Sequence, residues 1–358
     1  MASTLAAIPE SNGAAPQAAF APLRDSYGRA ITDLRVSVTD RCNFRCVYCR
    51  SGNDGQGYSE LPLAEYARAI RLFVSLGIDK VRFTGGEPLL RQGLVDLVRE
   101  TAQLRPGFDP EGRLDLALTT NGHLLAPMVH ELKAAGLSRV TVSMDAVDPA
   151  TFARITRVPS SFERVRDGIR AAQDAGLGPV KVNCVLLRGF NDEQIEAFAE
   201  FSRAEEVIVR FIEFMPLEEA SDATGGRSWT WESVIPMDEI LARLTNVAPV
   251  VVLPANGPSE TARRFSFADG RGEIGIIAPV SRPFCGACSR VRLTSDGKVR
   301  TCLFSQTDHD LAGRMHRGAT DADLRDWIRS VVDRKEARHH IGEPGFLKPS
   351  RSMVHIGG

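Results

Sequence analysis

Short apolar runs rich in β-branched residues alternate with amphipathic stretches between about residues 33 and 214. The runs that predict strands are Asp33–Thr39, Lys80–Thr84, Leu114–Thr120, Arg139–Ser143, Val180–Leu186 and Val207–Phe214. The stretches whose apolar spacing predicts helices include Leu63–Leu76, Leu94–Leu104, Leu124–Ala135 and Phe162–Ala175. Strand and helix alternating six times predicts βα units and a parallel sheet.

Several of these strands carry polar side chains at alternate positions, although a parallel strand covered on both faces should be apolar. In the fifth strand Lys181 and Asn183 share one face, and in the sixth Arg210 shares a face with Ile212. A barrel whose interior is also a binding cavity explains this pattern better than a flat sheet. Because six units do not fill an eight-unit barrel, we predict a partial, laterally open (βα)6 TIM-like barrel.

The pattern changes after Met215, where a loop-like stretch precedes shorter elements. Helices are expected over Met237–Leu244 and about Asp321–Arg338, with His339 at the solvated end of the latter. Short strands are expected over Val250–Leu253, Arg264–Phe267, Glu273–Ile277, Val291–Thr294 and Lys298–Leu303. The turn signal Asp296-Gly297 predicts that the last two form a hairpin. These elements predict a smaller C-terminal α+β domain.

The 358 residues are enough for about two domains. Residues 1–22, rich in Ala, Pro and Ser without periodicity, predict a disordered extension. The barrel is then expected over 23–235 and the second domain over 236–358. A net charge of −1 and the absence of a long apolar run predict neither a nucleic-acid nor a membrane partner. Residues 281–358 nevertheless carry 14 Lys and Arg against 9 Asp and Glu. This positive excess indicates either a solvated basic helix or a binding site for an anionic ligand.

The seven cysteines fall in two groups of three and one single residue, Cys184. An odd count argues against a disulfide framework. Without a secretory or transit signal we expect a cytoplasmic protein, where clustered thiols favour metal binding. Cys184 lies on the apolar face of a predicted strand, so we expect it to be a packing residue.

The first group, Cys42, Cys46 and Cys49, has the spacing Cys-x3-Cys-x2-Cys and follows the first strand, at the end where barrel enzymes keep their active sites. Three thiolates can bind three irons of a cubane cluster, which leaves the fourth iron open to a substrate. The alternative is a zinc knuckle with a distant fourth ligand.

The second group, Cys285, Cys288 and Cys302, supports the same argument. Arg290 and Arg292 alternate on the strand that leaves Cys288, so positive charge lies close by. A cluster with an open iron, an electron-relay cluster and a zinc ribbon completed by a histidine all remain possible here.

The first triplet, with the aromatic Tyr48 before its last cysteine, resembles the radical S-adenosylmethionine (SAM) superfamily. The segment Thr84-Gly85-Gly86-Glu87-Pro88 after the second strand is a second feature of that superfamily. The resemblance implies a [4Fe-4S] cluster on the three cysteines, with SAM chelating the open iron. It also implies that the Gly-Gly-Glu-Pro loop meets the methionine end of SAM. On chemical grounds, the carboxylate of Glu87 in this loop can pair with the ammonium of the ligand.

The chain from about residue 24 resembles the GTP 3′,8-cyclase family, molybdenum cofactor biosynthesis protein A. The segments that carry this resemblance are Asp33–Cys42, Val81–Pro88, Thr119–Gly122, Val142–Asp145, Lys181–Asn183, Phe211–Met215 and Cys285–Arg292. It implies that SAM contacts Tyr48, Gly86, Ser143 and Met215. It implies that GTP contacts Arg35, Arg82, Thr119, Lys181, Arg290, Val291 and Arg292, joined by Arg210. It implies a second [4Fe-4S] cluster on Cys285, Cys288 and Cys302.

This resemblance implies conversion of GTP to (8S)-3′,8-cyclo-7,8-dihydro-GTP through a 5′-deoxyadenosyl radical, the first step of molybdenum cofactor biosynthesis. The implied partners are an electron donor such as flavodoxin or ferredoxin and cyclic pyranopterin monophosphate synthase, with the enzyme a monomer or homodimer. The terminal Gly357-Gly358 either frays or reaches the active site. The rival interpretations are a radical enzyme that modifies peptides and a non-enzymatic metal module.

Overall fold

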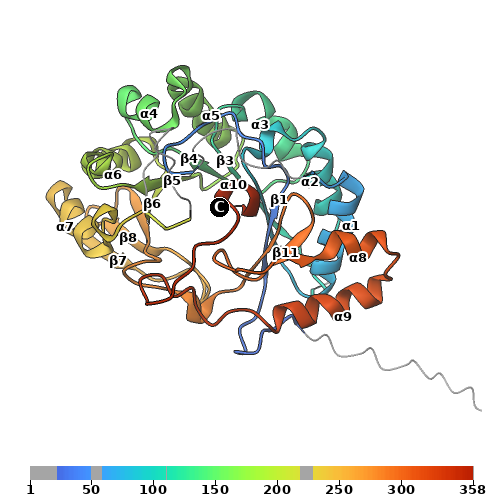
Figure 1. Cartoon of the computed structure of the whole chain (residues 1–358). Coiled ribbons are helices and arrows are strands. Elements are labelled where there is room, and N and C mark those ends of the chain that lie inside the picture. The colour runs from blue at the N-terminus through green and yellow to red at the C-terminus, as the bar shows by residue number, and fades with distance from the viewer. Residues whose placement is uncertain (1–21, 50–58, 110, 218–228, 358) are drawn as a thin grey trace, which may run out of the picture.

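In the part of the chain that the structure describes, twelve strands form one sheet, which organises the fold (Figure 1). The computed structural model describes residues 22–49, 59–109, 111–217 and 229–357, so the extension expected over 1–22 lies outside it except for Pro22. Six parallel strands form the centre of the sheet in chain order: β1 (Asp33–Ser37), β2 (Lys80–Thr84), β3 (Asp115–Thr120), β4 (Arg139–Ser143), β5 (Lys181–Leu186) and β6 (Ile208–Glu213). All six lie within the predicted runs, so the expected parallel sheet is confirmed.

Helices surround the sheet on its outer side (Figure 1). Those of the first half are α1 (Leu63–Ser75), α2 (Leu94–Ala102), α3 (Leu125–Ala134), α4 (Pro149–Thr156), α5 (Phe162–Asp174) and α6 (Ile195–Glu205). Each buries an apolar stripe; in α1 this stripe includes Tyr66, Ile70 and Phe73. Among the described residues, no helix has the length and apolarity needed to cross a membrane.

The C-terminal region adds strands to both edges of this central unit. β9 (Glu273–Ile277) runs parallel to β6, and β10 (Arg290–Leu293) runs parallel to β1. Antiparallel strands continue the sheet outward: β8 (Arg263–Phe267) and β7 (Val250–Leu253) beyond β9, then β11 (Lys298–Arg300) and β12 (His309–Asp310) beyond β10. The hairpin expected at Asp296-Gly297 is confirmed by the pairing of β10 with β11. The open sides of the partial barrel are thus flanked by strands from the same chain.

Four helices complete this region: α7 (Met237–Val247), α8 (Leu311–His316), α9 (Asp321–Val332) and α10 (Met353–Ile356). The last long helix was expected to continue to Arg338, and this is wrong. The chain leaves the helix because Lys335 is buried and its ammonium donates to the carbonyl of Arg290 at 3.0 Å. His339 consequently lines the interior cavity and does not cap a solvated helix end.

Successive side chains along the strands face in turn the apolar core and the interior cavity. In β1, Leu34 and Val36 are fully buried in the apolar core, whereas Arg35 between them faces the interior cavity. Cys184 is also fully buried in that core, which confirms it as a packing residue. The polar positions predicted to line a barrel interior therefore do so, and the partial barrel is confirmed.

Candidate active site

A cavity of about 500 Å³ occupies the interior of the barrel. Its lining extends from Asp33 and Lys80 at the start of two strands to Thr84 and Ser143 at the ends of strands. Both cysteine groups lie on its wall: Cys42, Cys46, Cys49, Cys285, Cys288 and Cys302. All six are free thiols with partly exposed side chains. Two triplets more than 230 residues apart in sequence therefore face one space.

The loop that carries the first triplet is held against the end of α4. The amide of Arg45 donates to the carbonyl of Thr156 at 3.1 Å, and that of Val47 to Ile155 at 3.0 Å. One backbone donor also approaches sulfur: the Phe44 amide lies 3.4 Å from Cys42 Sγ. Hydrogen bonds to sulfur are one means by which proteins tune iron–sulfur clusters. The donor set and its surroundings fit a cluster at this position.

The described residues hold no three Cys, His, Asp or Glu side chains that converge on a single metal ion. A cubane cluster has a different requirement, since each of three thiolates binds its own iron.

The two glycines after β2 allow this loop to pack directly on the backbone that leads to Cys42. A Cβ on Gly85 would lie 2.3 Å from the carbonyl oxygen of Thr39, and one on Gly86 would lie 2.3 Å from that of Arg41. Gly85 also has a φ of 145°, which side chains with a Cβ rarely adopt. Both glycines line the cavity, as expected for Gly86.

The carboxylate of Glu87 does not face the cavity, contrary to the expectation that it pairs with a ligand ammonium. It is fully buried and accepts from the Asn121 amide at 2.7 Å, the Thr120 hydroxyl at 2.8 Å and the Leu89 amide at 3.0 Å. Burial raises the pKa of Glu87 to about 7, against the effect of these donors. Glu87 therefore ties the ends of β2 and β3 together.

Tyr48 is fixed by a buried carboxylate. Its hydroxyl donates to Asp145 at 2.7 Å, and the same carboxylate accepts the amide of Val185 at 2.8 Å. Burial raises the pKa of Asp145 to about 6. Ser143 and Met215 line the same cavity, so the structure brings together all four residues expected at SAM.

The second triplet lies beside cations. Arg290 Nη2 donates to Cys288 Sγ at 3.2 Å. Burial alone would raise the pKa of Cys288, but Arg290 and Lys335 outweigh it and lower the pKa to about 6. The thiolate form that an iron cluster requires is therefore favoured at this cysteine.

A row of arginines crosses the cavity wall. Arg35 is paired in register with Arg82 on one side and with Arg292 on the other. Arg82 donates to the hydroxyls of Thr119 at 3.1 Å and Thr141 at 3.3 Å. These side chains project inward from three adjacent strands and create a concentrated positive field.

Several cations of this wall are buried close to one another. Burial, reinforced by neighbouring arginines, lowers the pKa of Lys181 to about 8 and that of Arg210 to about 9. Burial also lowers the pKa of Arg35 to about 10, although Asp33 opposes this. The Nε of Arg35 is buried without a hydrogen-bond partner. A polyanionic ligand would satisfy these groups.

One expected GTP residue differs from the others, because the Val291 side chain is 1% exposed and packs in the apolar core. Sequence reasoning also missed several residues of the cavity wall: Lys80, Arg139, Asn256, Ser259, Glu260, Met353 and Val354. Lys80 and Arg139 could have been predicted from the alternation of polar and apolar positions that also indicates Arg82. The loop around Glu260 carries no such signal.

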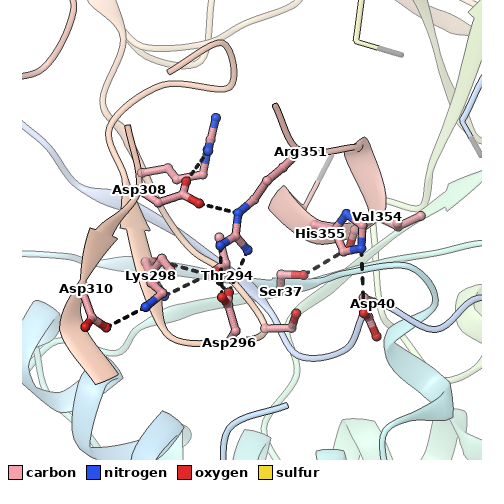
Figure 2. A network of polar contacts seen from close by, with 12 residues as sticks. Ser37, Asp40, Thr294, Asp296, Lys298, Asp308, Asp310, Arg351, Val354 and His355 are labelled. Carbon is pink, nitrogen blue, oxygen red and sulfur yellow. Dashed lines mark hydrogen bonds and ion pairs between the residues drawn. The ribbon is translucent and has the colours of Figure 1, made fainter. Parts of the chain in front are cut away.

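The C-terminal tail closes one side of the cavity, with α10 over the middle of the barrel (Figure 1). The guanidinium of Arg292 donates to the carbonyls of Ile356, at 3.2 Å, and Gly357. Figure 2 shows how the tail is anchored: Arg351 lies between Asp296 and Asp308, and His355 lies 3.7 Å from Asp40. Gly358 lies outside the described residues.

Comparison with known proteins shows the family of the chain. Residues 36–202 match the family model of the Radical SAM superfamily, and residues 207–341 match that of Molybdenum Cofactor Synthesis C. A curated relative from Peptoclostridium acidaminophilum, named GTP 3′,8-cyclase, is 41% identical over 94% of this chain and 98% of its own. The chain belongs to the GTP 3′,8-cyclase family. Members with the same name from Acidothermus cellulolyticus and Streptomyces coelicolor are 43% and 42% identical over 89% and 94% of this chain, and 88% and 96% of their own.

A solved structure shares the fold of this GTP 3′,8-cyclase family member. The crystal structure of Streptococcus suis SuiB matches with a TM-score of 0.55 and 13% identity, over 87% of this chain and 67% of that one. At this identity the likeness concerns the fold alone. Family membership brings with it the use of SAM and of iron–sulfur chemistry.

Proposed function

We propose that this chain converts GTP to (8S)-3′,8-cyclo-7,8-dihydro-GTP, the first step of molybdenum cofactor biosynthesis. The curated relatives that support this activity match nearly the full chain. The observation that carries it is the cavity itself, in which two cysteine triplets face one space with a wall of buried cations. A radical initiator and a polyanionic substrate both need such a space.

Cys42, Cys46 and Cys49 would hold the first [4Fe-4S] cluster and leave its fourth iron open. Once bound there, the cluster and SAM supply a 5′-deoxyadenosyl radical, which is chemistry of the cofactor rather than of the protein. The protein orients SAM. Tyr48, held by Asp145, and Gly86 form part of the wall, and Ser143 and Met215 complete the set.

GTP would lie along the rest of the cavity. Guanidinium forks suit phosphate oxygens, so Arg35, Arg82 and Arg210, with Lys181, would hold the triphosphate. Thr119 would fix the Arg82 side chain through their hydrogen bond. The guanine would then reach the second triplet, beside Arg290 and Arg292; the buried side chain of Val291 leaves only its backbone for a contact.

The second [4Fe-4S] cluster would use Cys285, Cys288 and Cys302, and its open iron would bind the guanine base. The Gly357-Gly358 tail would enter the active site.

The protein would act in the cytoplasm as a monomer or homodimer. A flavodoxin or ferredoxin would donate the electron, and the product would pass to cyclic pyranopterin monophosphate synthase. The barrel would end near residue 235, before the auxiliary domain.

An anaerobic assay with GTP, SAM and a strong reductant tests this function. We expect 5′-deoxyadenosine and a cyclised nucleotide to form in equal amounts, with about eight irons per chain. Cys42→Ala should abolish both products, whereas Cys288→Ala should abolish the cyclised nucleotide and leave SAM cleavage detectable. The proposal fails if SAM is cleaved at the same rate with and without GTP and no nucleotide product appears. A peptide-modifying enzyme would give that result.

A further inference from the structure

The segment that follows α9 contacts the chain beside two cysteines of the second triplet, Cys288 and Cys302. Lys335, only 3% exposed, donates from its ammonium to the carbonyl of Arg290 at 3.0 Å and to that of Thr301. Arg290 lies two residues after Cys288, and Thr301 directly precedes Cys302. One buried ammonium therefore joins two of the three cysteine segments.

The third segment is joined by Arg29, which precedes the first strand of the barrel. Arg29 Nη1 donates to the carbonyl of Cys285 at 2.8 Å and to that of Ala337 at 2.9 Å, and Nη2 donates to the backbone carbonyl of Glu336 at 2.7 Å. Asp25 holds Arg29 Nε at 2.5 Å, with the carboxylate fully buried. The guanidinium thus ties Cys285 to the segment that carries Lys335.

We call Arg29, Lys335 and Glu336 together the clamp, and a further contact joins it to the segment of Cys302. The Thr301 hydroxyl donates to the carboxylate of Glu336 at 2.7 Å. All three members come from outside the cysteine loops, one before β1 and two after α9. Hydrogen bonds from these outside groups therefore hold the segments of Cys285, Cys288 and Cys302 relative to one another.

We infer that Arg29 and Lys335 are positioning residues for the second iron–sulfur cluster. The inference rests on the proposed function, in which the second triplet binds that cluster. Neither side chain binds iron in this arrangement. They fix the carbonyls of the three cysteine segments and so hold the three thiolates in position to bind the cluster. Loss of outer groups that orient ligands typically weakens metal binding about 10- to 100-fold.

The test separates the two sites in the full-length chain. Replacing Cys42, Cys46 and Cys49 by Ala leaves only the second triplet, and replacing Cys285, Cys288 and Cys302 by Ala leaves only the first. Each background is reconstituted anaerobically, and iron content, the EPR signal of the reduced cluster and the rate of iron loss to a chelator are measured. Arg29→Met and Lys335→Met are introduced into both. The control is Arg338→Met, since Arg338 is exposed and pairs only with Glu343 among the contacts described, at 2.9 Å.

With only the second triplet present, Lys335→Met and Arg29→Met should speed iron loss about tenfold or more, while Arg338→Met should not. With only the first triplet present, the same variants should lose iron at the parent rate, which also shows that they fold. Lys335→Arg should retain part of the second cluster's stability. Equal iron loss at both sites, or loss in the control, would overturn the inference. If the parent with the second triplet binds no cluster at all, the proposed second cluster itself is wrong.

Discussion

Arg292 of β10 donates a hydrogen bond to the carbonyl oxygen of Gly357, the penultimate residue of the chain. The arginine is 4% exposed, and burial together with the nearby Arg35 and Arg290 lowers its pKa well below the usual range. A Cβ on Gly357 would approach Thr84 Cγ2 to 2.6 Å, so the tail lies tightly against the end of β2. The end of the described chain therefore orients a cation of the cavity wall.

Deleting Gly357 and Gly358 should lower turnover of GTP by about 100-fold, because displaced catalytic groups typically cost this much. Iron content and SAM binding should remain at the level of the full chain, since the cysteine loops are held by other contacts. Product formation under anaerobic conditions is the measurement. Full activity in the truncated chain would show that the tail has no role.

Arg351→Ala should act through the tail. Arg351 is 7% exposed and donates to both oxygens of Asp296, at 2.8 and 3.0 Å, and to Asp308 (Figure 2). Without this anchor, α10 should detach and turnover of GTP should fall about tenfold, equivalent to about 1.4 kcal/mol in the activation barrier.

A double-mutant cycle distinguishes this role from general destabilisation. In the chain lacking Gly357 and Gly358, Arg351→Ala should cause no further fall in turnover. An equal loss in both backgrounds would contradict the anchor. Arg282→Ala is the control, because it also removes an arginine–aspartate ion pair, the exposed one with Asp238 at 3.0 Å.

The barrel and much of its wall could be predicted because their signals are local. Leu34 and Arg35 differ in polarity at adjacent positions, and a strand places adjacent side chains on opposite faces. The cysteine spacing was equally informative, since three thiols at the end of the first strand already indicate a cluster.

Other features depend on partners distant in sequence and could not be predicted. Asp33 pairs in register with Arg290, more than 250 residues away, so local patterning does not reveal that β10 extends the sheet beside β1. Lys335 follows helical spacing in the sequence, yet its contacts with Arg290 and Thr301 end the helix early. The sequence around Glu87 predicts a ligand-binding carboxylate, but in the fold this side chain accepts three internal hydrogen bonds.

Gly86→Ala should disrupt the first cluster site. The new Cβ would lie 2.3 Å from the Arg41 carbonyl oxygen, which cannot move without shifting the loop that begins at Cys42. We expect a loss of more than about 2 kcal/mol in the free energy of unfolding, together with poor iron loading at the first triplet. Thermal unfolding and iron analysis measure both. Gly178→Ala is the control, since its Cβ would meet nothing nearer than 3.9 Å; equal behaviour of the two variants would contradict the close-packing argument.

GTP affinity should fall as pH rises through about 8 because of Lys181. Burial, then Arg210, Arg139 and Arg82, lower the pKa of this lysine to about 8, so the free protein loses the ammonium above that pH. A bound triphosphate favours the ammonium, and binding above this pH must therefore take up a proton. Linkage then weakens binding by up to about tenfold per pH unit. Lys181→Met should bind GTP more weakly at pH 7 and show a flatter profile between about pH 7 and 9.

Equilibrium GTP binding to the anaerobic protein without reductant, at constant ionic strength, measures this profile. Lys181→Arg is the matched variant: its guanidinium stays charged throughout, so the profile should flatten while affinity at low pH is largely kept. Arg210, whose pKa burial lowers to about 9, adds a further fall only at the upper end of the range. Parallel profiles for the parent and Lys181→Met would show that Lys181 does not control the pH dependence, because removing the titrating group must remove its share of the slope.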